Sequence, residues 1–167
     1  MGNINYMPPE VKGKLNNLLS EEFKAERHYL SCAIWCQNNG YDIAAKFFYA
    51  ESESEKGHAQ KLINYFTDLS DSPTLPFIAE GTTTFTNLLD VINVSLLSFE
   101  KPLYDLYGKV YSEIEEEYPQ CAKFLLDFIQ IQHDSISEYS NMIDILNGVN
   151  PSDKFAMLML QEQLFKM

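Results

Sequence analysis

The chain has 167 residues, of which 46% are hydrophobic, and its formal net charge is −12. This length and apolar content predict one folded domain, residues 1–167, with a sizeable core, and they exclude a disordered chain. A surface this acidic repels phosphate backbones and anionic lipids, so we expect no nucleic acid and no membrane among the partners. The seven glycines and seven prolines are few, which favours long helices over a β-sandwich or barrel.

The N-terminal residues and the cysteines predict a cytoplasmic protein. Residues 1–12 lack the basic stretch and apolar core of a secretory signal. Gly2 stands where myristoylation occurs, but that motif requires Ser or Thr at the position of Tyr6. The cysteines number three, and an odd number in a chain without a signal indicates free thiols in a reducing compartment.

Two long helices are predicted first, from about Pro9 to Asn38 and from about Asp42, a plausible N-cap, to Leu69. In each helix one face is marked by residues spaced three or four apart. These faces hold Leu15, Leu18, Glu22, Ala25, Tyr29, Cys32 and Cys36, and then Ala44, Phe48, Glu51, Glu55, His58, Leu62, Tyr65 and Leu69. The Asn39-Gly40 pair ends the first helix, and so short a connection makes the two helices antiparallel neighbours.

The segment from Ser70 to about Thr86 has no helical period and contains Pro73, Pro76 and Gly81. Such long loops are uncommon inside compact domains. A loop of about 17 residues, at roughly 3.3 Å each, can span a helix about 40 Å long. The segment is therefore predicted to run the length of the bundle, so that the third helix begins parallel to the second.

Two more long helices are predicted, from about Asn87 to Glu117 and from Pro119 to about Asn147. Their inward residues are Leu89, Leu96, Glu100, Leu103, Tyr107, Val110 and Ile114, and then Leu125, Phe128, Gln132, Ser135, Tyr139, Met142 and Leu146. Pro102 lies inside the third helix, where its ring clashes with the carbonyl of Ser98, so we expect a kink beside Glu100.

The fold class predicted is therefore all-α. It is a four-helix bundle over about residues 9–147, with a long crossover between helices 2 and 3. A short apolar fifth helix, Lys154 to Phe165, follows within about residues 152–166. This helix either caps its own bundle or packs against other copies of the chain.

Each long helix places a polar side chain in its apolar face near mid-length. These are Glu22, then Glu55 with His58, then Glu100, then Gln132. Several carboxylates converging in one core are untenable unless cations neutralise them. Glu55 and His58 lie at i and i+3, so their side chains point the same way. Oxygen ligands with one imidazole suit iron better than a metal that seeks thiolates, which predicts a pair of iron ions.

The neighbouring polar residues have plainer interpretations. A lone Glu-x-x-His pattern is weak, and only the coincidence over four helices makes it specific. We expect Glu51 to be a polar residue near the bundle's edge, and His28 and His133 to be surface residues. Tyr29 lies on the face of Glu22, where it either hydrogen-bonds a metal-bound carboxylate or fills the core.

At these residues the chain resembles the ferritin family, and bacterial non-haem ferritins in particular. The segments are KLNNLLSEEFKAERHYLSCAIWC, YDIAAKFFYAESESEKGHAQKLINYFTD, SFEKPLYDLY and IQIQHDSISEYSNMIDIL. The resemblance implies a first iron held by Glu22, Glu55 and His58, and a second by Glu55, Glu100 and Gln132, with Tyr29 beside them. It also implies a shell of 24 identical subunits that oxidises iron(II) with oxygen and stores the product as mineral. Bacterioferritins repeat Glu-x-x-His on the fourth helix, where this chain does not, so no haem is expected.

The chain departs from the family pattern in ways that bear on activity. Ser54 stands where a second glutamate usually precedes the bridging one, and Ile131, Asp134 and Ser135 replace glutamates near Gln132. With the kink expected at Pro102, these changes predict a well-formed first iron site, a weaker second site and slow oxidation.

Three other functions stay open at this stage. The first is a ferritin-like protein that binds iron with weak or impaired ferroxidase activity and poor mineralisation. The second is a small di-iron oxidase, or a plain bundle, that assembles no shell. The third is a DNA-protecting mini-ferritin, although that type places its ligands between subunits and lacks a fifth helix.

Overall fold

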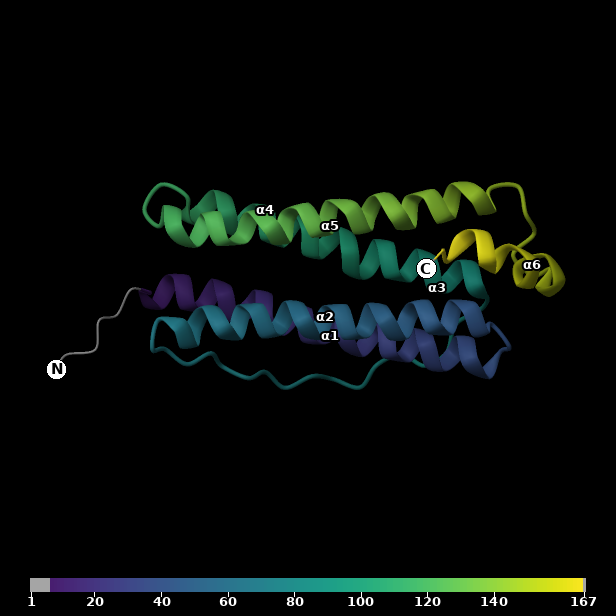
Figure 1. The fold of residues 1–167 in the computed structure, drawn as a ribbon, viewed down its shortest axis with the longest axis horizontal. Coiled ribbons are helices and arrows are strands. Elements are labelled where there is room, and N and C mark those ends of the chain that lie inside the picture. Colours follow the sequence, from purple (N-terminus) through teal and green to yellow (C-terminus); the bar gives the residue numbers. More distant parts are fainter. Residues whose placement is uncertain (1–6, 167) are drawn as a thin grey trace.

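The computed structural model describes residues 7–166, and Gly2, Tyr6 and Met167 lie outside them. Within residues 7–166 the chain forms helices and loops but no strand. Four long helical segments lie side by side as one elongated bundle, with a short helix across one end (Figure 1). The predicted all-α four-helix bundle with a short fifth helix is confirmed. No helix in the described part of the chain is long and apolar enough to cross a membrane.

The first two helices form an antiparallel hairpin. Helix α1 spans Pro9–Asn38 and begins on a proline, whose missing N–H costs nothing in the first turn. Helix α2 spans Asp42–Asp68, preceded by Tyr41 as its N-cap rather than by Asp42. Gly40 lies between the helices with φ of +81°, a backbone conformation that glycine adopts without strain. The tight turn therefore fixes α2 directly against α1.

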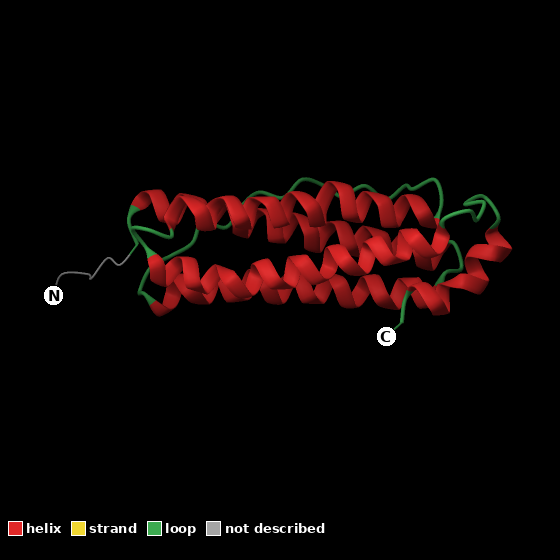
Figure 2. Cartoon of the chain, turned by 90° about the horizontal axis from the view of Figure 1, so that it is seen from above, coloured by secondary structure: helices red, strands yellow, loops and turns green. Residues whose placement is uncertain are grey.

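The crossover runs along the outside of the bundle, past the α1–α2 pair, as Figures 1 and 2 show. It is tied to α1 at several points. Lys12 pairs with Asp71 at 2.6 Å, and the Thr74 N–H donates to Asn16 Oδ1 at 2.8 Å. Gly81 passes so close to α1 that a Cβ there would collide with the Ser31 side chain. These contacts carry the chain to the far end of the bundle, as predicted.

The third long helix is continuous but changes its winding ahead of Pro102. It comprises α3 (Leu88–Val94), the π-helical segment η1 (Ser95–Glu100) and α4 (Lys101–Ile114). The Lys101 N–H bonds the Leu96 carbonyl, five residues back. A π-turn widens the helix and so relieves the clash that a proline ring makes with the carbonyl four residues earlier. The kink expected at Pro102 thus takes the form of a π-turn that ends at Glu100.

Helices α5 (Pro119–Leu146) and α6 (Lys154–Leu164) complete the chain. Helix α6 packs on the start of α2, where Gln161 Oε1 accepts from the N–H groups of Ile43 at 3.1 Å and Ala44 at 3.3 Å. These N–H groups belong to the first turn of α2, which has no partners within its own helix. The opposite side of α6 leaves Phe155 73% and Met159 67% exposed. Helix α6 therefore caps its own bundle and still presents an apolar outer face.

The core consists of two apolar clusters at the two ends of the bundle. One contains Tyr29, Phe48, Ile92, Tyr139 and Leu146, among others. The other contains Leu15, Leu18, Leu62, Val110 and Leu125, among others. Each long helix contributes one stretch of apolar residues to each cluster. The buried polar residues named above lie between these two stretches. We call this mid-bundle set the polar layer: Glu22, Glu55, His58, Glu100 and Gln132.

Candidate metal centre

The polar layer is almost completely shielded from solvent. Its five side chains are at most 8% exposed, and Glu22 is 0% exposed. No lysine or arginine in residues 7–166 forms an ion pair with any of these side chains. Buried carboxylates without a cation are costly. The fold therefore assembles a buried site whose charge is not balanced by the protein.

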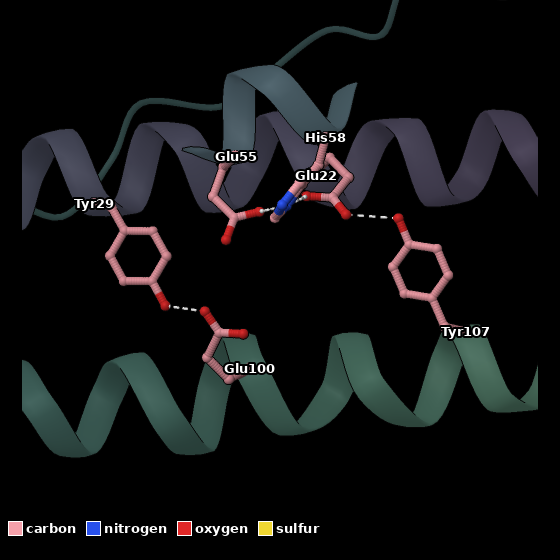
Figure 3. Close-up of polar contacts among 6 residues, drawn as sticks. All are labelled: Glu22, Tyr29, Glu55, His58, Glu100 and Tyr107. Carbon is pink, nitrogen blue, oxygen red and sulfur yellow. Dashed lines mark hydrogen bonds and ion pairs between the residues drawn. The ribbon is translucent and has the colours of Figure 1, made fainter. Parts of the chain in front are cut away.

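One half of the site joins α1 and α2. Glu22, Glu55 and His58 each offer a ligand atom, and these atoms lie within 4.8 Å of one another. His58 Nδ1 is 3.1 Å from Glu55 Oε2 and 3.6 Å from Glu22 Oε2 (Figure 3). Glu22 Oε2 forms no hydrogen bond with the described residues. This buried Glu/Glu/His cluster offers the ligand atoms that a divalent metal ion requires.

The other half of the site joins α2 to η1. Ligand atoms of Glu51, Glu55 and Glu100 also lie within 4.8 Å of one another. Glu55 thus belongs to both halves, and Figure 3 shows it between Glu22 and Glu100. Glu100 is 1% exposed, and its Oε2 has no hydrogen-bond partner among the described residues. The π-turn therefore keeps Glu100 in the site, two residues before the proline at which the sequence predicted a kink.

Glu51 is a residue that the sequence analysis misplaced. It was expected at the bundle's edge, but it is half-buried and shares the cluster of Glu55 and Glu100. The signal was present, because Glu51 and Glu55 lie one turn apart, at i and i+4, on the same helix face. The Glu-x-x-His pattern that begins at Glu55 is the stronger indication of metal ligands, and it does not include Glu51.

Three tyrosines border the carboxylates. The Tyr29 hydroxyl donates a hydrogen bond to Glu100 Oε1, and the Tyr107 hydroxyl donates to Glu22 Oε1 at 2.6 Å. Tyr139 stacks on Tyr29 with ring centroids 6.2 Å apart, and its hydroxyl has no hydrogen-bond partner among the described residues. For Tyr29 the sequence left both a carboxylate hydrogen bond and core filling open, and the structure shows the hydrogen bond, while Tyr107 and Tyr139 were expected only as inward-facing residues. The two bonded hydroxyls orient carboxylates that each keep one oxygen free.

The pKa values of the neighbouring carboxylates Glu22 and Glu55 shift in opposite directions. Burial is the largest influence on the pKa of Glu22 and raises it, but interactions with Glu55, His58 and Tyr107 lower the pKa below its ordinary value. Burial raises the pKa of Glu55 well above its ordinary value, and contact with Glu22 and the charge of Glu100 add to that rise. Glu22 therefore favours its charged form, and Glu55 favours its protonated form.

Glu100 and Glu51 also hold protons more strongly than free glutamates. Burial raises the pKa of Glu100 to about 7 against the lowering effect of the Tyr29 hydrogen bond, and the charges of Glu22 and Glu138 add to the rise. Burial, followed by the charges of Glu138 and Glu100, raises the pKa of Glu51 to about 7. A cation that binds here must displace protons, as is usual when metal ligands deprotonate.

Gln132 supplies an independent indication of a cation-binding site. It is 1% exposed on α5, and both its amide atoms lack hydrogen-bond partners among the described residues. Buried amides are nearly always hydrogen-bonded, so each exception requires an explanation. A bound cation, with its own ligands, satisfies such an orphaned oxygen.

The structure corrects the prediction for one of the two other histidines. His133 is exposed, as expected. His28 is 4% exposed, with Nε2 2.9 Å from Ser95 Oγ and its ring stacked on Phe99 at 3.9 Å. Burial lowers the pKa of His28 to about 4. Its partners lie on η1, far away in the sequence, so the periodicity of α1 alone could not show them.

The arrangement as a whole fits two cations that share one carboxylate. Hard oxygen donors dominate, with a single imidazole on one side, and thiolates are absent from the polar layer. The orphaned oxygens of Glu22, Glu100 and Gln132 are available without breaking any hydrogen bond in the described structure. Side chains of α1, α2 and η1 therefore form a buried, acidic site inside the bundle.

Comparison with known proteins places this chain in a family. The sequence pattern of the ferritin-like domain matches residues 12–149, which cover most of the chain. The chain belongs to the ferritin family. A bacterial non-heme ferritin of Campylobacter jejuni is 26% identical over 153 residues, which are 87% of this chain and 92% of that protein.

Two further relatives show the same distant similarity. A probable bacterial non-heme ferritin-like protein of Haemophilus influenzae is 26% identical over 144 residues, covering 84% of this chain and 85% of that protein. A bacterial non-heme ferritin of Staphylococcus saprophyticus is 23% identical over 140 residues, covering 84% of each chain. The similarity to bacterial non-heme ferritins thus extends over nearly the whole bundle.

Proposed function

We propose that this chain is an iron-storage ferritin that oxidises iron(II) with oxygen at a dinuclear site and deposits the product as mineral. The observation that carries the proposal is the buried Glu22–Glu55–His58 cluster, which joins a second carboxylate cluster through Glu55. Iron is the substrate and cargo, and no haem is involved. Each iron(II) loses one electron, and oxygen accepts the electrons.

The residues have distinct roles in this proposal. Glu22 and His58 hold the first iron, Glu100 and Gln132 hold the second, and Glu55 bridges the two. Tyr29 and Tyr107 fix the orientation of the carboxylates through the hydrogen bonds they donate to Glu100 and Glu22. The apolar clusters on both sides exclude water from the site, which strengthens the attraction between carboxylates and cations.

We further propose that the chain acts in the cytoplasm as a homo-oligomer of 24 subunits. Apolar side chains left exposed at neighbouring positions of the outer surface support assembly, since contiguous apolar patches mark interaction surfaces. They include Leu30, Ile34, Leu75, Phe77, Phe155 and Met159. The three cysteines are all buried and free, in accord with a reducing compartment.

Aerobic addition of iron(II) to the purified protein tests the function directly. The proposal expects a rapid rise in near-ultraviolet absorbance, a brown product that stays soluble, and dense cores by electron microscopy. Glu55→Ala/His58→Ala should abolish the rapid phase, while Glu53→Ala/Lys56→Ala, at exposed positions of the same helix, should leave it unchanged. Equal rates in the two double variants would refute the proposal.

A second candidate is a ferritin-like protein that binds iron but turns it over poorly. Ser54 is exposed and Ser135 is half-buried, so neither supplies the carboxylate that the family pattern has there. Iron leaving the dinuclear site would then meet fewer acids. Stopped-flow absorbance separates the candidates, because the second predicts stoichiometric binding with oxidation slower than in ferritins that have the full set of acids.

A further inference from the structure

Glu51 occupies a position in the site that none of the expected ligand roles explains. It lies one turn before Glu55 on α2, and its carboxylate reaches the cluster formed with Glu55 and Glu100. It is half-buried, and no lysine or arginine in residues 7–166 pairs with it. A third carboxylate in this place adds repulsion to a pair that is already costly.

An orphaned oxygen lies in the same cluster and indicates what the third carboxylate faces. Glu100 is 1% exposed, and Tyr29 occupies only its Oε1. Its Oε2 has no partner in the described residues. Glu55 points from α2 toward Glu100 across the space between the helices (Figure 3). Three carboxylates therefore converge around one position, with at least one oxygen left free for a ligand.

We propose that Glu51 is a direct ligand of the second cation position, so that three carboxylates, Glu51, Glu55 and Glu100, hold that cation together with the amide oxygen of Gln132. This inference rests on the proposed dinuclear site and adds a ligand to it. Of the three carboxylates, Glu51 and Glu55 lie on one helix face at i and i+4, and Glu100 comes from the π-turn. The second position is then as well supplied with charge as the first, contrary to the expectation from Pro102.

The two positions then differ in the cations they prefer. The first has two carboxylates and the imidazole of His58, a combination that suits zinc as well as iron. The second has oxygen donors from three carboxylates, a set that favours hard cations such as manganese(II) over zinc. The proposed geometry therefore gives the chain one position tolerant of zinc and one selective for hard ions.

A purely electrostatic role for Glu51 is the competing explanation, and Glu138 provides the control for it. Glu138 on α5 is near enough for its charge to act on both Glu51 and Glu100. It does not share the cluster in which ligand atoms lie within 4.8 Å. Removing either charge changes the local field, but only one removal takes away a ligand. Glu53, exposed on the same helix, controls for charge loss outside the site.

The test is an anaerobic titration of the purified full-length protein with manganese(II), in which free manganese is read by electron paramagnetic resonance. The wild type should bind two manganese ions per chain. Glu51→Gln should weaken one of the two sites by tenfold or more and leave the other unchanged. Glu138→Gln and Glu53→Gln should keep both sites within about threefold of the wild type. Glu51→Asp should restore part of the lost affinity.

The failures of the inference and of the proposed function are distinguishable. If the wild type binds two ions and Glu51→Gln behaves like Glu138→Gln, the inference is overturned and the dinuclear site stands. If the wild type binds no ion in the polar layer, the inference about Glu51 and the proposed dinuclear site are both refuted. A manganese-soaked wild-type crystal, read by anomalous scattering, does not depend on any variant. It should place a Glu51 oxygen within coordination distance, roughly 2.0–2.6 Å, of the second ion, and a longer separation would overturn the inference.

Discussion

The polar layer and the apolar clusters on either side of it are built from the same four helices but follow opposite physical rules. The clusters bury residues such as Leu18, Phe48 and Leu125 at 0% exposure, and each burial stabilises the fold. The layer buries Glu22, Glu55 and Glu100 without an ion pair to any lysine or arginine of residues 7–166, and each burial opposes folding. The apolar clusters at the two ends of the bundle therefore stabilise the fold. Their contribution offsets the unfavourable burial of the polar layer between them.

This contrast separates stability from function within one core. A change in an apolar cluster is expected to alter the free energy of unfolding and to leave the set of ligands intact. A change in the polar layer is expected to alter cation binding and, in the metal-free protein, to relieve part of the cost of burial. The four predictions below test this division, beginning with the largest effect.

Replacing Glu55 and His58 together with alanine removes the residue that the two halves share and the only imidazole in the layer. We expect iron(II) binding to weaken by roughly 100-fold or more, since even indirect partners of metal ligands commonly contribute 10–100-fold. Anaerobic isothermal titration calorimetry measures this loss. Iron affinity that stays at the wild-type level would show that the layer is not the binding site.

Leu18→Ala makes a cavity in the apolar cluster nearer the N-terminus, where Leu18 is 0% exposed. Such truncations destabilise proteins by about 2–5 kcal/mol. Denaturant unfolding should show this loss, while the number of iron ions bound per chain stays unchanged. The exposed residue Leu126, at 45% exposure, offers the control Leu126→Ala, with an expected loss below about 1 kcal/mol. If Leu18→Ala bound fewer iron ions per chain, the separation of stability in the apolar clusters from cation binding in the polar layer would be contradicted.

Glu100→Gln should stabilise the metal-free protein at neutral pH. The pKa of Glu100 is raised from 4.5 to about 7, so the folded state keeps a proton that the unfolded state releases. Stability from this group is complete below pH 4.5 and is lost as the pH rises through 7. Glutamine cannot ionise, so the variant should gain up to about 3 kcal/mol over the wild type at pH 8 and nothing near pH 4.

Denaturant unfolding at several pH values, with a chelator present, measures this difference. Divalent cations should reverse it, because they stabilise the wild type more than the variant. A constant difference between pH 4 and pH 8 would contradict the assignment of this titration to Glu100.

Tyr107→Phe removes the hydroxyl that donates to Glu22 at 2.6 Å and leaves the ring stacked on Phe128. A hydrogen bond to a buried group contributes about 0.5–1.5 kcal/mol. We therefore expect a several-fold weaker first iron site and an unchanged second site. Tyr111→Phe, on the same helix but outside the layer, is the matched control. Equal affinities in the two variants would mean that Tyr107 only fills space.

The bundle itself was predictable because its signals are local. Helix α1 occupies the predicted range, and α2 begins at the predicted residue, since periodicity, Gly40 and the short connection all indicate the same hairpin. The path of the crossover was predictable because the segment between the second and third helices is long enough to span the bundle. The π-turn could not be derived, because the clash at Pro102 has several solutions, a kink among them, and packing against the other helices decides which one forms.

The candidate site was predictable only in part, for a similar reason. Glu22, Glu55, His58, Glu100 and Gln132 interrupt apolar stripes, and that local signal placed all five in one buried layer. The i, i+4 spacing places Glu51 on the helix face of Glu55, but whether its carboxylate reaches Glu100 depends on the position of η1, which that spacing does not encode. His28 was misplaced because Ser95 and Phe99, which bury it, come from a distant segment.

The most direct measurement is a crystal of the protein soaked anaerobically in iron(II) and read by anomalous scattering at the iron edge. Two iron peaks are expected inside the bundle, one among Glu22, Glu55 and His58 and the other among Glu51, Glu55 and Glu100. A map with iron only on the outer surface, and with the mid-bundle carboxylates unmoved, would contradict the claim that cations compensate this buried charge.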